Sequence, residues 1–66
     1  MREFILMENG LKKATFEKAE DAINCVLNDK EISLDNVRIM EHVLIEHYET
    51  IPYSKWHDIL MEKIKW

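Results

Sequence analysis

The dipeptide Asn9-Gly10 narrows what this chain can fold into more than any other feature, because it holds the single glycine of the sequence. Asn-Gly between two runs that contain hydrophobic residues is the strongest short-range signal for a β-hairpin with a two-residue type I′ turn. We therefore predict a hairpin over about residues 3–15. A short N-terminal helix that ends at Asn9-Gly10 is the alternative, since both residues also suit helix C-termini.

The first strand of this hairpin would be apolar on both faces, because residues 4–7 read Phe-Ile-Leu-Met. Pairing of Glu8 with Leu11 would place Lys13 and Thr15 on the face that carries Phe4. An isolated hairpin is barely stable in water. We expect this one to pack on helices.

Residues 16–28 have the periodicity of a surface helix. At 100° per residue their apolar side chains fall in one arc of about 140°, with carboxylates and amides opposite. Thr15 is a suitable N-cap. The pattern predicts an amphipathic helix over about 16–28.

Two further helices are predicted on either side of Pro52, which disfavours helical geometry in the residue before it. Residues 34–49 follow a possible cap at Ser33, and their apolar side chains span about half of the helical circle. A stripe that wide predicts the central helix or half of a dimer seam. Ser54 can cap a third helix over about 55–65.

We thus predict one compact domain over residues 1–66, with an α+β fold that is mostly helical. An N-terminal hairpin (about 3–15) would pack on three helices (about 16–28, 34–49 and 55–65). A chain of 66 residues buries only about 60% of its unfolded surface. The single cysteine, Cys25, cannot form an internal disulfide. A homodimer through the second and third helices would enlarge the core.

The charge of the chain argues against nucleic acid as a partner. Nine basic and 13 acidic residues give a net charge of −4, and neither half carries a basic cluster of the kind that binds phosphate. The alternative is a DNA-associated regulator that uses 34–49 and 55–65 as a helix-turn-helix-like unit. Lys55, Lys63 and Lys65 favour it, whereas Asp58 on the same helix opposes it.

Catalytic and metal-binding patterns are weak, so we expect no enzyme activity, no cofactor and no metal. His42 and His47 lie five residues apart and would diverge on a helix, unlike the two His of a zinc-protease helix. Cys25 would sit in the middle of a helix, where no N-terminal dipole lowers its pKa.

The same composition bears on localisation. The apolar run 4–7 is far too short for a signal peptide or a membrane span. A lone cysteine favours a reducing compartment. We expect a cytoplasmic protein that does not enter the membrane.

A surplus of apolar and aromatic side chains is the strongest functional signal. Ile45, Tyr53, Trp56, Met61 and Trp66 lie at or outside the predicted core arcs, or open the third helix. Trp and Tyr are favoured interface anchors. These five residues are our candidate protein interface, and completion of the chain's own core is the equally weighted alternative.

Glu41, Glu46 and Glu49 would add an acidic face on the second helix. The leading hypothesis is a small non-enzymatic interaction module that binds and modulates, by steric inhibition, a larger partner protein. Frequent Ile with scarce Ala, Gly and Pro suits a low-GC source such as a phage or mobile element. An acidic mimic of DNA is a further alternative, although a solvated face is the simpler explanation for the glutamates.

Overall fold

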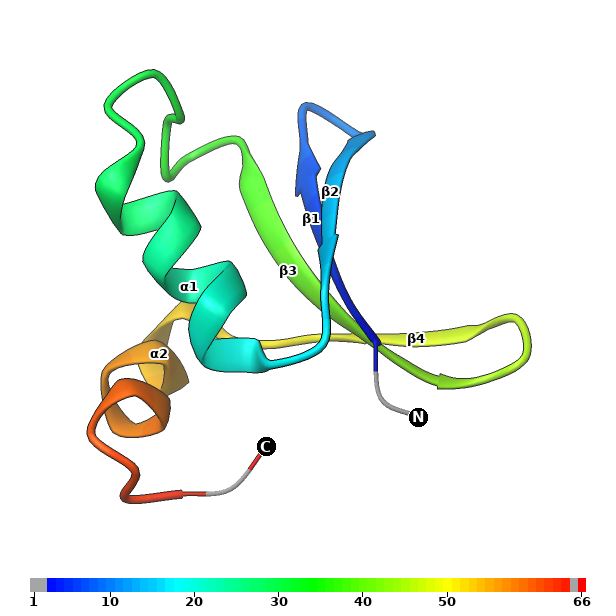
Figure 1. Cartoon of the computed structure of the whole chain (residues 1–66). Helices are drawn as coiled ribbons and strands as arrows, with labels where there is room; N and C mark the ends of the chain where they lie inside the picture. Colours follow the sequence, from blue (N-terminus) through cyan, green and yellow to red (C-terminus); the bar gives the residue numbers. More distant parts are fainter. Residues whose placement is uncertain (1–2, 65) are drawn as a thin grey trace.

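The computed structural model describes residues 3–64 and residue 66, and this part of the chain contains two successive ββα units (Figure 1). The elements, in chain order, are β1 (Glu3–Glu8), β2 (Leu11–Phe16), α1 (Ala19–Asn28), β3 (Val37–Leu44), β4 (His47–Thr50) and α2 (Tyr53–Leu60).

The four strands form one antiparallel sheet in the order β2-β1-β3-β4. Strands β1 and β3 pair at its centre from Glu3 opposite His42 to Glu8 opposite Val37. Each ββα unit therefore supplies one inner strand and one edge strand. The end of the β3–β4 hairpin, residues 43–48, extends away from both helices (Figure 1), and we call it the arm.

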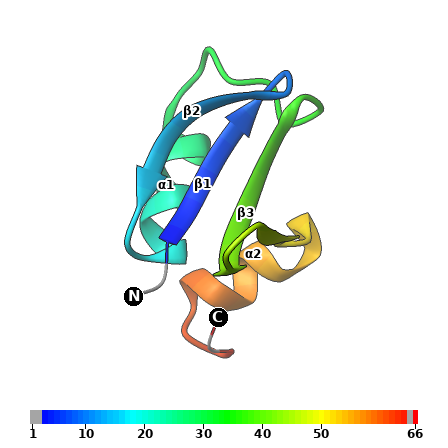
Figure 2. The ribbon, with the colours of Figure 1, turned by 90° about the vertical axis from the view of Figure 1, so that its right-hand side faces the viewer.

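Both helices lie on the same side of the sheet (Figure 1). Helix α1 packs against β1, β2 and β3, and α2 packs against α1. Figure 2 looks onto the other face, where none of the described helices lies. The molecule thus has two layers, a sheet and a pair of helices. None of the helices in residues 3–64 is long and apolar enough to cross a membrane.

The core lies between these two layers and draws on both ββα units. The side chains of Leu6 on β1, Ile23 on α1 and Ile39 on β3 are fully buried there. The other buried members of this cluster are Phe4, Ala19, Ala22, Val26, Ile32, Val37, Ile51, Trp56 and Ile59.

The prediction of a mostly helical fold with three helices is wrong. Residues 37–49 of the predicted helix 34–49 instead lie in β3, in β4 and in the turn between them. Val37 and Ile39 pack into the core, whereas Arg38 and Met40 lie on the opposite face. This alternation of buried and outward-facing side chains is typical of a strand. It lets β3 pair with β1, whose two apolar faces suit a central strand with a neighbour on each edge. The predicted dimer seam and helix-turn-helix both required a helix over 34–49, so this structure does not contain them.

The other two helices exist, but with different ends. Helix α1 begins at Ala19, three residues later than predicted, because Phe16 still pairs with Phe4 as the last residue of β2. Helix α2 begins at Tyr53 and ends at Leu60, earlier than the predicted end at Lys65, which lies outside the described residues.

The N-terminal hairpin is confirmed, and the alternative of an N-terminal helix is wrong. Asn9 and Gly10 have φ of 53° and 80°, as a type I′ turn requires. The register shifts between Leu6 and Met7, so β2 carries one extra residue there. Consequently Thr15 pairs with Ile5, and our assignment of Thr15 to the face of Phe4 is wrong.

Candidate protein-interaction site

The five predicted interface residues lie in different environments. Ile45 is 90% exposed in the turn of the arm, and Tyr53 and Met61 are exposed at the two ends of α2. Trp56 is only 5% exposed and belongs to the core, whereas Trp66 is half-buried and packs against the core. The structure does not bring these five side chains into one surface.

Trp56 is held inside the fold by specific contacts. Its Nε1–H donates a hydrogen bond of 3.3 Å to the carbonyl oxygen of Ile51. The Tyr53 ring covers it, with the ring centroids 5.0 Å apart and the planes tilted by 57°. Because its polar atom is paired within the chain, the Trp56 ring serves the core.

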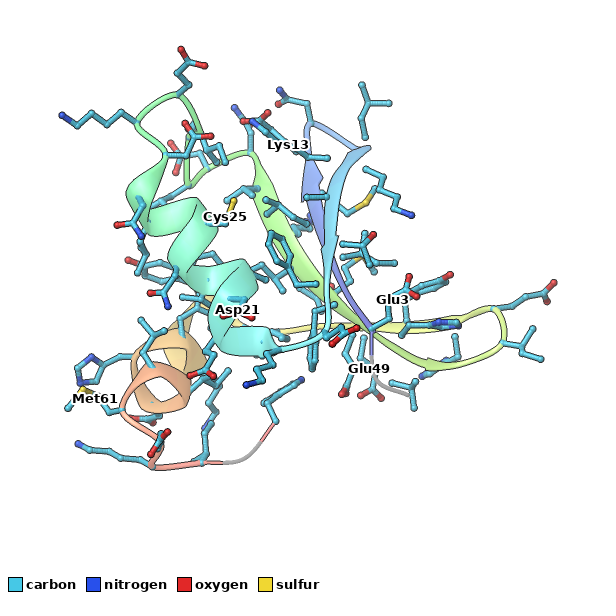
Figure 3. The ribbon with its side chains drawn as sticks, in the orientation of Figure 1. Glu3, Lys13, Asp21, Cys25, Glu49 and Met61 are labelled. Carbon is cyan, nitrogen blue, oxygen red and sulfur yellow. The ribbon has the colours of Figure 1, made fainter. Side chains whose placement is uncertain are left out.

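The predicted acidic face is changed by the loss of the helix. Glu41 on β3 pairs with Glu49 on β4, so both lie on the helix side of the sheet, whereas Glu46 lies in the turn of the arm. Glu41 is buried and Glu49 is exposed. In Figure 3 the side chain of Glu49 points away from the strand at the lower edge of the sheet.

Glu41 is also paired with Phe4 on β1. The feature that we take as the candidate site lies beside Phe4. A hollow of about 500 Å³ opens beside Phe4, between the start of α1 and the segment after α2. It is lined by Phe4, Glu17, Lys18, Ala19, Glu20, Ile59, Glu62, Ile64 and Trp66. We call it the acid-rimmed hollow.

Turns at two places bring these residues together. The chain bends after Phe16, so Glu17 and Lys18 stand between the end of β2 and the start of α1. After α2, Glu62 adopts a left-handed φ of 58°, and the chain then places Ile64 and Trp66 against the core. The hollow thus depends on tertiary packing of both ββα units.

The lining combines apolar and acidic groups. Phe4 and Ile59 are buried apolar side chains, and Ile64 and Trp66 are half-buried. Three glutamates (Glu17, Glu20, Glu62) and one lysine (Lys18) also line the hollow, which leaves an excess of two negative charges. Such a site suits an arginine or lysine side chain, which has an apolar stem and a cationic end. The indole ring adds a surface for cation–π contact.

Sequence reasoning found only one of these residues, Trp66. It assigned Glu17 and Glu20 to the solvated face of a helix and Phe4 to a hairpin, and it did not consider Ile59 as a site residue. These positions are far apart in sequence and become neighbours only when α2 packs against α1. A single sequence holds no direct signal for that contact.

Other kinds of chemistry have less support in the described residues. Within residues 3–64 and 66, no three His, Cys, Asp or Glu side chains are grouped so that they could hold a metal ion. Cys25 is a half-buried free thiol in the middle of α1. Comparisons with protein-family models, curated proteins and solved structures find no match to this chain. The geometry of the acid-rimmed hollow is therefore the basis for a functional proposal.

Proposed function

We propose that this protein is a non-enzymatic interaction module that binds a basic segment of a larger partner protein in the acid-rimmed hollow. The observation that carries the proposal is an apolar floor beside three carboxylates, those of Glu17, Glu20 and Glu62. The floor is formed by the buried Phe4 and Ile59 and by the partly exposed Ile64 and Trp66. A hydrophobic patch with a polar rim is the usual anatomy of a protein interface.

In the bound state, the stem of a partner arginine or lysine packs on the apolar floor. Its cationic end lies near the glutamates, where charge-assisted hydrogen bonds to carboxylates are stronger than neutral ones. The acidic net charge of the chain steers a basic partner toward it. The body, about 30 × 28 × 17 Å, then covers the basic surface of the partner and modulates it sterically.

The proposed interface shares only Trp66 with the five interface residues predicted from the sequence. Tyr53 and Met61 are exposed outside the lining of the acid-rimmed hollow, so they are not part of it. The DNA-associated alternative required a helix over 34–49, and that segment is a hairpin.

A peptide titration tests the proposal. A short peptide of alternating arginine and leucine is added to ¹⁵N-labelled protein, and amide shifts are followed by NMR. We expect the shifts to change most at residues 17–20 and 59–66. Replacing two rim carboxylates (Glu17→Gln with Glu62→Gln) should weaken binding by about tenfold, as expected for two partly solvated charge contacts.

The matched control removes the same charge elsewhere. Glu31 and Glu49 are exposed and lie outside the acid-rimmed hollow, so Glu31→Gln with Glu49→Gln should leave the affinity almost unchanged. Equal losses in both double variants would mean that the peptide responds only to net charge. The proposal would then be wrong. Affinity capture from source cells should likewise retain its partner with the control and lose it with the rim variant.

A further inference from the structure

We infer that the face of the sheet opposite the helices is the interface for a second copy of this chain. This open face is defined by the register of the strands, which places side chains in three rows across it. The middle row contains Ile5 and Met40, flanked by Thr15 and Thr50. Both central side chains are apolar and lie on a face that the described helices leave uncovered (Figure 2), although Ile5 is only 8% exposed and Met40 is partly exposed.

The two outer rows carry opposite charges. In one row Met7 lies between Lys12 and Arg38. In the other, His42 lies between Glu3 and Tyr48. The arm continues beyond this second row and carries Glu46 in its turn. The open face therefore has a basic end and an acidic end on either side of an apolar middle.

Two copies of the open face are complementary to each other when they are related by a two-fold axis. This axis lies between the two faces and runs perpendicular to the strands. It places the basic row of each copy over the acidic row of the other and the apolar rows against each other. Charges of opposite sign then meet twice, at Arg38 with Glu46 and again at the symmetric pair. A partner of a single charge sign would match only one end of the face.

The arm and the basic end also fit in shape. The arm extends on the open side of the sheet, away from the helices (Figure 1). Ile45 is almost fully exposed on it, and Tyr48 is exposed on its edge strand. At the basic end, a hollow of about 420 Å³ contains one carboxylate as well as the Arg38 guanidinium, and it is lined by Met7, Gly10, Asp35, Asn36, Arg38 and Met40. In the dimer the arm of each copy lies over this hollow in the other.

A polar atom on the open face also has no hydrogen-bond partner among residues 3–64 and 66. The ring of His42 stacks on Tyr48, with centroids 4.6 Å apart and planes 17° from parallel. Its Nε2 atom is buried, and it makes no hydrogen bond among the described residues. Buried polar atoms are seldom left unpaired. The two-fold arrangement brings the donors of Lys12 and Arg38 from the second copy to the row that holds His42.

The area of the open face limits the expected affinity of the dimer. Four strands about 4.8 Å apart and three rows about 7 Å apart give roughly 400 Å² per copy. Stable interfaces bury at least about 600 Å² per partner, so the arms must supply the remainder. We expect a weak dimer, with a Kd between about 10 µM and 1 mM. The acid-rimmed hollow is lined from the helix side, so a dimer presents two such hollows outward and binds a repeated basic partner with two sites.

A charge exchange in sedimentation equilibrium tests the dimer. The mass should rise from 8.0 kDa toward twice that value between about 1 µM and 1 mM protein. Arg38→Glu alone or Glu46→Arg alone should raise the Kd at least tenfold. The combined Arg38→Glu, Glu46→Arg variant should recover most of the affinity, because it restores opposite charges across the interface. Both substituted positions are exposed, so all three variants should keep the fold.

The control exchange is Lys30→Glu with Glu31→Arg, at exposed positions between α1 and β3. It should not change the Kd. In a mixture of labelled and unlabelled protein, isotope-filtered NMR should show contacts between the methyl groups of Met7 and Tyr48 of the other copy. A monomeric mass at 1 mM, or no recovery in the exchanged variant, would overturn the inference. Because Glu17→Gln with Glu62→Gln leaves the open face intact, it should weaken peptide binding by about tenfold without affecting the dimer, which separates this inference from the proposed function.

Discussion

The two hairpins of this protein have the same place in the fold but very different turns. Each gives its first strand to the centre of the sheet and its second strand to an edge, and each is followed by a helix. The β1–β2 turn uses Asn9-Gly10, two residues that adopt positive φ readily. The β3–β4 turn uses Ile45-Glu46, and Glu46 has a φ of 65° without being Gly or Asn.

The difference between the two turns indicates that the two hairpins are stabilised in different ways. The first is encoded locally, because its turn residues favour the required backbone even in a short peptide. The second must hold Glu46 in a conformation that costs an L-residue about 1–2 kcal/mol. Pairing of β3 with β1 and burial of Ile39 have to offset that cost. The second hairpin is therefore a product of tertiary structure.

The largest predicted effects are at the centre of the sheet, where the two hairpins meet. Leu6 and Ile39 pair across β1 and β3, and both are fully buried. Leu6→Ala or Ile39→Ala should each lower the free energy of unfolding by about 3 kcal/mol. A chain of this length has roughly 3–10 kcal/mol in total. Urea unfolding followed by circular dichroism measures the change.

The milder variant Ile39→Val, expected to cost about 1 kcal/mol, remains measurable if the alanine variants do not fold. The controls are the exposed residues Leu11 and Ile45, whose replacement by Ala should change stability by less than about 0.5 kcal/mol. If Ile39→Ala were as mild as Ile45→Ala, β3 would not be a central strand. The two hairpins would then not be equivalent.

The turns should respond to substitution in opposite directions. Gly10→Ala meets no steric obstacle but forces Ala to a φ of 80°, so it should destabilise the protein by about 1–2 kcal/mol. Glu46→Gly removes a similar penalty but adds flexibility to the unfolded chain, so it should stabilise by about 0.5 kcal/mol. Thermal unfolding of both variants beside the parent protein tests this pair.

Glu46→Gln is the matched control for the second turn, because it removes the charge but keeps the backbone cost. Its melting temperature should stay close to that of the parent. A loss of stability in Glu46→Gly would show that the left-handed residue carries no penalty here. The contrast between the two turns would then disappear.

How far the sequence predicts this fold follows from the same contrast. Asn9-Gly10 predicts the first hairpin because its signal is local. Residues 37–43 carry two compatible patterns, since Val37, Ile39 and Val43 are separated by even numbers of residues, as on one face of a strand, and also fall in a wide helical arc. With no Gly, Asn or Pro at the second turn, nothing local selects the strand. Pairing with β1 decides it, and that pairing is not visible in one sequence.

The candidate site was less predictable than the fold. The surplus of aromatic residues pointed to Trp56, whose ring is buried, and to Trp66, which lines the acid-rimmed hollow. The rim residue Glu20 also lies in the first turn of α1, where acidic groups interact favourably with the helix dipole, and Glu17 lies just before the helix. Glu17 and Glu20 line the acid-rimmed hollow because the turn at Glu62 brings the C-terminal segment beside α1. The periodicity of the sequence does not predict that the C-terminal segment packs beside α1.

The smallest effect is expected at the ion pairs that tie the first hairpin to α1. At the irregular position of β2, Lys13 Nζ lies 3.3 Å from Oε1 of Glu8 and 3.7 Å from Oδ2 of Asp29. Desolvation alone would lower the pKa of Lys13, but its hydrogen bond to Glu8 and the nearby carboxylates raise it above the usual 10.5. The folded state therefore holds this proton more tightly than the unfolded state does.

From this sign, the stabilisation by Lys13 is fully present below about pH 10.5 and is lost as the pH rises through the raised pKa. Because the groups are exposed and screened by salt, Lys13→Gln should lower the melting temperature only slightly at pH 7. The difference between parent and variant should shrink toward zero above that range. Lys12→Gln, on the open face, removes the same charge without these partners and should show no such trend. An equal response of both variants would mean that only net charge matters, and that the bulge of the first hairpin adds no contact that the second hairpin lacks.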